Sequence, residues 1–167
     1  MTLHVTPPRK TLRTDLFKTS QRQSTRGVLI RYSNTINDPR IDAVALDDWD
    51  CARGYFGCVS HFIVRTDGRI ERGRDPRTIS SAPKPWQAPD HIVVTVVGGL
   101  DVDAEFQAND TEEQEIALEV LLQAIATALN IPLEITDQRA YLRNKAYAAY
   151  LAETGEYQDD DDDSTIS

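Results

Sequence analysis

The sequence predicts a single α/β domain in which helices cover the faces of a mixed β-sheet. The chain has 167 residues, of which 40% are hydrophobic and 27% are charged, as in a globular domain with one core. Residues 91–97 (His-Ile-Val-Val-Thr-Val-Val) form the most β-branched run and indicate a central strand. Residues 111–114 (Thr-Glu-Glu-Gln) match a helix capping box, and an apolar stripe at helical spacing follows as far as Leu129.

The remaining elements give the order strand, helix, three strands, helix, strand, helix. Asp67-Gly68 separates two β-rich runs, which is a strong hairpin signal. The segment from Pro76 to Asp90 contains four prolines, so we expect an extended surface loop there. The other predicted strands are 27–33, 59–65, 69–73 and 132–136, and the other predicted helices are 37–53 and 138–153.

The negative charge is concentrated at the C-terminal end of the chain. Of the formal charge of −9, Glu156 and Asp159–Asp163 contribute −6, which leaves −3 for all other residues. We expect an N-terminal arm at 1–16, the domain at 17–154 and an acidic disordered tail at 155–167, which aids solubility or contacts a basic partner. Because phosphate binding needs clustered Lys and Arg, the nearly neutral body argues against a nucleic-acid partner.

The sequence shows no targeting signal, and its cysteine usage fits a reducing compartment. We therefore expect a cytoplasmic protein, located in the host cytoplasm if a phage encodes it. No apolar run approaches the ~20 residues that span a bilayer, so no membrane partner is expected. Residues 1–10 lack the apolar segment of a signal peptide. Cys51 and Cys58 do not form a C-x-x-C pair, so we expect buried or half-buried thiols, with a disulfide or redox role as the alternative.

The chain contains five motifs in a consistent order: Gln23–Thr35, His61–Gly68, Glu71–Asp75, Val96–Gly99 and Phe106–Gln114. They give it a family resemblance over roughly residues 17–145. It is similar to type-2 N-acetylmuramoyl-L-alanine amidases, most closely the small amidase lysozymes of short-tailed phages, which share the fold of peptidoglycan recognition proteins. The resemblance implies a mixed, mainly five-stranded sheet flanked by about three helices, and a cleft that holds zinc and a muropeptide in active members.

The resemblance also implies where zinc ligands should lie, and the residues at those positions are unsuitable. The two ligand histidines fall at Arg31 and Asp137, and the ligand cysteine falls at Lys145. A guanidinium has no lone pair to donate and stays protonated in proteins. One carboxylate does not hold a catalytic zinc ion, so we expect no zinc and no other cofactor. Arg31 and Asp137 have opposite charges and are expected to form an ion pair in place of the metal.

The family's other functional positions are altered as well. The catalytic tyrosine falls at Ser60, the assisting lysine at Arg143, and a loop histidine near Ala82. His61 is expected to be a packed, hydrogen-bonded core residue. Because Ser60 and His61 are neighbours on opposite faces of a strand, a Ser-His-Asp arrangement is disfavoured. His4 and His91 show no ligand spacing with His61.

These losses lead us to expect a catalytically inactive amidase-fold phage protein that acts by binding another protein. The expected partner is a phage or host protein that it inhibits, such as an RNA polymerase or a defence factor. The alternatives are a non-hydrolysing protein that binds peptidoglycan or muropeptides, an atypical or residual amidase (endolysin), and a structural virion component. The candidate binding residues are Arg31, Trp86 and Asp137, because an exposed Trp beside the cleft is a natural anchor.

Overall fold

A six-stranded mixed sheet forms the centre of the computed structural model, which describes residues 2–17, 19–80 and 89–154. Strands β3 and β4 are antiparallel, and every other neighbouring pair is parallel. Ala82, Trp86 and the acidic tail lie outside the described residues. Across the sheet the order is β1 (Val5–Thr6), β4 (Ile70–Arg72), β3 (Phe62–Val64), β5 (His91–Val96), β2 (Gly27–Tyr32) and β6 (Glu134–Asp137).

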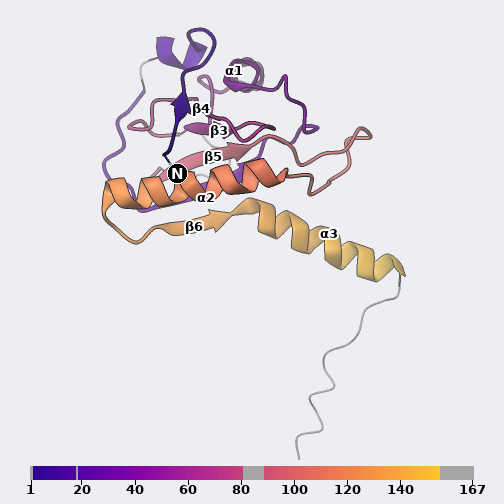
Figure 1. The fold of residues 1–167 in the computed structure, drawn as a ribbon. Coiled ribbons are helices and arrows are strands. Elements are labelled where there is room, and N and C mark those ends of the chain that lie inside the picture. Colours follow the sequence, from indigo (N-terminus) through magenta and orange to yellow (C-terminus); the bar gives the residue numbers. More distant parts are fainter. Residues whose placement is uncertain (1, 18, 81–88, 155–167) are drawn as a thin grey trace, which may run out of the picture.

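Three α-helices flank this sheet, as the sequence predicts (Figure 1). They are α1 (Ala43–Ala52), α2 (Glu112–Leu129) and α3 (Gln138–Thr154), and a short 3-10 helix, η1 (Arg13–Leu16), precedes β2. In the part of the chain that the structure describes, none of the helices combines the length and apolar character that a membrane span requires.

The N-terminal segment contributes more to the fold than an arm would. Val5–Thr6 pairs in parallel with Ile70–Glu71 and adds the sixth strand at one edge of the sheet. Leu12 is only 1% exposed and belongs to the core beside α1. A two-residue strand has no detectable periodicity, which is why the sequence pattern does not reveal it.

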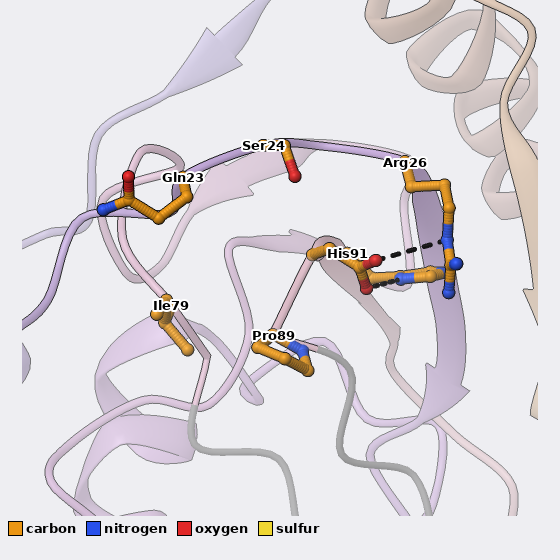
Figure 2. Close-up of a pocket in the computed structure, with 7 residues that line it drawn as sticks. Gln23, Ser24, Arg26, Ile79, Pro89 and His91 are labelled. Atoms are coloured by element: carbon orange, nitrogen blue, oxygen red, sulfur yellow. Dashed lines mark hydrogen bonds and ion pairs between the residues drawn. The ribbon is translucent and has the colours of Figure 1, made fainter.

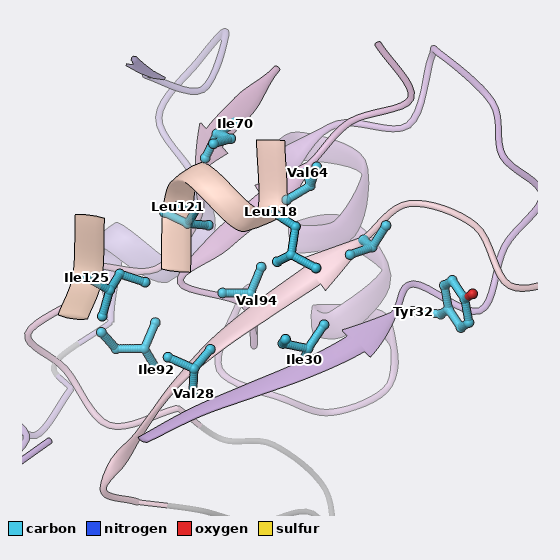
Figure 3. Packing of buried hydrophobic residues seen from close by; sticks show 11 residues of the cluster. Val28, Ile30, Tyr32, Val64, Ile70, Ile92, Val94, Leu118, Leu121 and Ile125 are labelled. Atoms are coloured by element: carbon cyan, nitrogen blue, oxygen red, sulfur yellow. The ribbon is translucent and has the colours of Figure 1, made fainter. Parts of the chain in front are cut away.

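Helix α2 covers one face of the sheet and forms the larger core (Figure 3). Its capping box is confirmed: the Gln114 N–H donates to Thr111 Oγ1 at 3.1 Å, and the Thr111 N–H donates to Gln114 Oε1 at 2.9 Å. Leu118, Leu121 and Ile125 of α2 pack in one cluster with the alternate residues Val28, Ile30 and Tyr32 of β2. These three β2 side chains therefore point toward α2, and Leu29 and Arg31 point to the other face.

Helix α1 lies over this second face, and it starts later than the sequence predicts. Asp42 is its N-cap, with the Ala45 N–H donating to Asp42 Oδ1 at 2.9 Å. The Ile41 N–H donates to the Asp38 carbonyl at 3.1 Å, so the predicted first turn of the helix is a separate β-turn. Asp50, which is 5% exposed, faces inward from α1 near Arg31.

Candidate functional site

Arg31 stands on the second face of the sheet, near the carboxyl end of β2. Its Nε donates one long hydrogen bond, 3.4 Å, to the Tyr32 carbonyl. Burial lowers the pKa of Arg31, and the negative charge of Asp50 opposes this effect. Among the described residues, no carboxylate oxygen lies within 4.0 Å of the guanidinium nitrogens. Arg31 is therefore a half-buried cation without a direct ion pair in this part of the chain.

Asp50 is the carboxylate that faces Arg31 from α1. The Val59 N–H donates to Asp50 Oδ2 at 2.9 Å. Burial raises the pKa of the Asp50 carboxyl, while the Val59 N–H and the Arg31 charge act in the opposite direction. A buried acid whose pKa is raised holds its proton more readily than an exposed carboxyl group, a property that acid–base residues of enzymes often share.

Two hydroxyl groups extend the floor of the site beside Arg31. Thr95 of β5 is the register partner of Arg31, so the two side chains share a face of the sheet. Thr95 Oγ1 and Ser60 Oγ form a hydrogen bond in which either oxygen can donate. Arg31 and Ser60, both identified from the family resemblance, therefore meet through Thr95. Sequence reasoning missed Thr95, although it is the single polar residue within the apolar run 92–97.

A shallow hollow of about 370 Å³ opens near the same end of β2. Thr35, Trp49, Ala52 and Arg53 line it. The Trp49 side chain is 39% exposed there. Arg53 is close enough to Arg31 for its positive charge to lower the pKa of Arg31 further. The site thus combines two cations, one buried carboxylate, hydroxyl groups and an accessible indole. Hereafter we call the group Arg31, Trp49, Asp50, Arg53, Ser60 and Thr95 the β2 site.

Asp137 and Arg143 belong to a different cluster, on the α2 side of the sheet. Asp137 is the register partner of Ile30, which faces α2, so its side chain does not share a face with Arg31. Arg139 Nη2 binds Asp137 Oδ2 at 3.0 Å, and Arg139 Nη1 binds Asp110 Oδ2 at 2.6 Å. Arg143 Nη2 lies 3.1 Å from Asp110 Oδ1. The expected ion pair between Arg31 and Asp137 is wrong.

The residues at the three family ligand positions do not fit a zinc ion. Arg31 offers only donors, and both Asp137 oxygens accept hydrogen bonds from Arg139. Lys145 is exposed on α3. Within the described residues, no group of three or more His, Cys, Asp or Glu side chains is placed to hold a metal ion. No step of the chemistry can be assigned to zinc at these positions.

His61 is a structural residue, as the sequence predicts. Its Nδ1 accepts the Val93 N–H at 2.8 Å, so Nε2 carries the proton and donates to the Thr78 carbonyl at 2.8 Å. Burial lowers the pKa of His61 to about 4. The two cysteines are free thiols, with Cys58 buried and Cys51 half-buried, which confirms their expected state.

A second hollow, of about 520 Å³, lies at the opposite ends of β2 and β5 (Figure 2). His91 Nδ1 and Asp90 Oδ1 are 2.8 Å apart. Arg26 Nε lies 3.2 Å from both Asp90 Oδ2 and Glu134 Oε2. Arg26 is thus paired with two carboxylates here, whereas Arg31 and Arg53 have no carboxylate within 4.0 Å in the described part of the chain.

Comparison with curated proteins places the chain among phage lysis proteins. It is 32% identical to the endolysin of Escherichia phage T7 over 102 residues, 61% of this chain and 67% of that protein. It is 31% identical to the endolysin of Klebsiella phage KP32 over 103 residues, 62% of this chain and 68% of that protein. This chain belongs to the phage endolysin family. No family model matches it.

Solved structures agree with this family at the level of the fold. The N-acetylmuramoyl-L-alanine amidase LysC from Clostridium intestinale superposes with a TM-score of 0.62 and 21% identity, over 83% of this chain and 85% of that one. Bumblebee PGRP-SA gives a TM-score of 0.64 at 9% identity, over 81% and 83% of the two chains. The chain has the type-2 amidase fold, as the sequence motifs indicate.

The expectation of a catalytically inactive, protein-binding function is wrong on this comparison. The relatives at 29–32% identity are named endolysins, and neighbours of the same fold are named amidases. Nothing supports an inhibitor of an RNA polymerase or of a defence factor. The expectation was drawn from the lost ligand positions alone, but altered ligands do not exclude hydrolysis by other groups in the cleft.

Proposed function

We propose that this endolysin binds peptidoglycan and hydrolyses the amide bond between N-acetylmuramic acid and L-alanine. The observation that carries the proposal is the 32% identity to the T7 endolysin over 102 residues. The fold shared with N-acetylmuramoyl-L-alanine amidases is consistent with it. Drosophila PGRP-LB, also of this fold, is known in complex with tracheal cytotoxin, which favours a cell-wall fragment as the ligand here.

We also propose that no zinc ion bound by Arg31, Asp137 and Lys145 takes part. Amide hydrolysis needs a group that activates water and donors that stabilise the developing oxyanion. Asp50 is assigned to water activation, because it is a buried carboxyl group that lies close enough to Arg31 and Arg53 to interact with their charges, and because burial raises its pKa. The hydrogen-bonded Ser60 and Thr95 hydroxyls are assigned as the donor, because Thr95 shares a face of the sheet with Arg31.

The proposal is tested on purified sacculi from a Gram-negative bacterium. Hydrolysis at this bond releases the stem peptide with a free L-alanine amino group, which is detected by amine labelling and mass spectrometry. Binding is measured in parallel by co-sedimentation with the same sacculi. We expect both the release of L-alanine amino groups and the sedimentation with sacculi to increase with the amount of protein. Both should be absent after heat denaturation. If the folded protein neither sediments with sacculi nor releases L-alanine amino groups, the proposal is overturned.

A further inference from the structure

The Arg31 guanidinium has unused hydrogen-bonding capacity within the site. Of its five N–H donors, Nε–H makes the one long bond to the Tyr32 carbonyl. The other four meet no acceptor among the residues that the structure describes. A half-buried cation without a partner is unfavourable, because burial removes hydration that nothing replaces. An anion that enters the site would therefore be stabilised by Arg31.

Arg53 adds a second cation to the same end of β2. It lines the hollow with Trp49 and Thr35, and its guanidinium has no carboxylate within 4.0 Å in the described part of the chain. Asp50 is attracted to both Arg31 and Arg53, but its carboxylate also accepts the Val59 N–H. Asp47, a second buried carboxylate near Asp50, accepts the N–H groups of Arg13, Thr14 and Cys58. Neither Arg31 nor Arg53 has a carboxylate within 4.0 Å in the described part of the chain, so both guanidinium groups remain available to an anion beside an accessible indole.

We propose that Arg31 and Arg53 bind a carboxylate of the acidic stem peptide, with Trp49 packing against the apolar part of the same ligand. The inference rests on the proposed function, since it takes peptidoglycan as the ligand. A guanidinium matches a carboxylate through two parallel N–H···O bonds, which gives specificity as well as affinity. The residue that replaces a family metal ligand thus becomes a binding group for an anion.

The probe is the tripeptide L-Ala-γ-D-Glu-L-Lys, compared with the same peptide in which the carboxylates are amides. Affinity is measured by titration calorimetry and by tryptophan fluorescence in a Trp86→Phe background, so that the signal comes from Trp49. We expect the acid form to bind about tenfold to a hundredfold more tightly than the amide form. Arg31→Ala should abolish this preference, Arg53→Ala should reduce it, and Arg31→Lys should retain part of it.

The matched control is Arg69→Ala, which removes an arginine paired with Asp67 on the β3–β4 turn. It should keep the full preference. Equal affinity for the acid and amide forms, no binding of either, or an unchanged preference in Arg31→Ala would overturn the inference. If Arg31→Ala unfolds, Arg31→Gln and Arg53→Ala decide the matter instead.

Sacculus hydrolysis and binding, measured on the same wild-type preparation, separate the two proposals. If the protein hydrolyses or binds sacculi but shows no preference for the acid form of the peptide, the carboxylate site is excluded and the proposed endolysin function stands. If the protein prefers the acid form of the peptide, and this preference depends on Arg31, the carboxylate site is supported. If the same preparation neither hydrolyses nor binds sacculi, the proposed endolysin function is excluded.

Discussion

Asp137 is held by Arg139, two residues away, with Arg139 Nη2 and Asp137 Oδ2 3.0 Å apart. Arg139 is 3% exposed and also binds Asp110 of the loop before α2 and Glu115 of α2. One guanidinium therefore joins the β6–α3 junction to the start of α2. This cluster, together with the pairing of β6 with β2, fixes the late part of the chain on the domain.

Replacing Arg139 with methionine should destabilise the protein strongly. The change removes the closest cation from the Asp110 carboxylate, which is 6% exposed, and leaves its contacts to Arg143 and Tyr32. Loss of one partner of a buried ion pair typically costs about 3–5 kcal/mol, because the other charge remains buried. Chemical denaturation should show the loss as a lower free energy of unfolding.

Arg77→Met is the matched control, since Arg77 is an exposed arginine that also pairs with an aspartate two residues away. Its effect should stay within about 0.5 kcal/mol. Equal stability of the Arg139 and Arg77 variants would mean that the cluster is not a stabilising junction.

The main elements of the fold could be predicted because each has a strong local signal. The β-branched run 91–97 and the capping box at Thr111 correspond to β5 and α2. The strand Val5–Thr6 could not be predicted, because its existence depends on pairing with a distant strand rather than on its own composition. The late start of α1 depends on the hydrogen bond between Ile41 and Asp38, which competes with helix formation.

The site could be predicted only in part, because the sequence does not fix the register of β6 against β2. The resemblance placed Arg31 and Ser60 in one site, and in the structure both neighbour Thr95, Arg31 through the strand register and Ser60 through a hydrogen bond. It also placed Asp137 with them, although Asp137 pairs with Ile30 and therefore faces the other side of the sheet. A shift of one residue in register exchanges the two faces, and motif order alone does not fix the register of a short edge strand. The sequence does not single out Asp50, because its burial beneath α1 depends on tertiary packing.

Protonation of His61 should weaken the fold in mildly acidic solution. The pKa of His61 is lowered from 6.5 to about 4 in the folded protein. Below pH 6.5 the unfolded chain binds a proton that folded His61 does not, so the stability that His61 provides above pH 6.5 is lost as pH falls toward about 4. The free energy of unfolding should fall by about 1.4 kcal/mol per pH unit within this window.

Denaturation between pH 7 and about pH 5, above the range where most carboxylates titrate, isolates this effect. His4→Gln, which changes an exposed histidine, should show the same slope as the wild type, and His61→Gln should show a shallower one. An unchanged slope in His61→Gln would assign the pH dependence to other groups.

Zinc analysis provides a direct check of the family ligand positions. Purified protein should contain well below one zinc ion per chain, because Arg31 has no lone pair and Asp137 is bound by Arg139. Arg31→His should not restore stoichiometric zinc, since Asp137 would still point to the α2 face. The measurement is elemental analysis after dialysis against buffer with trace zinc. One tightly held equivalent in the wild type would contradict the prediction.

Asp50→Asn should separate hydrolysis from binding. The asparagine amide has nearly the same shape and its carbonyl oxygen can still accept the Val59 N–H, but it cannot take a proton from water. If Asp50 activates water, release of L-alanine amino groups should fall by about a hundredfold or more, while sedimentation with sacculi is retained. Asp48→Asn, which changes a half-buried aspartate on the same helix, is the matched control and should leave both readouts unchanged. Melting temperatures show whether each variant is folded.

Because burial raises the pKa of Asp50, the wild-type rate should rise with pH as this carboxyl loses its proton, and this rise should be absent from the residual activity of Asp50→Asn. A variant that hydrolyses sacculi at the wild-type rate would exclude Asp50 as the base.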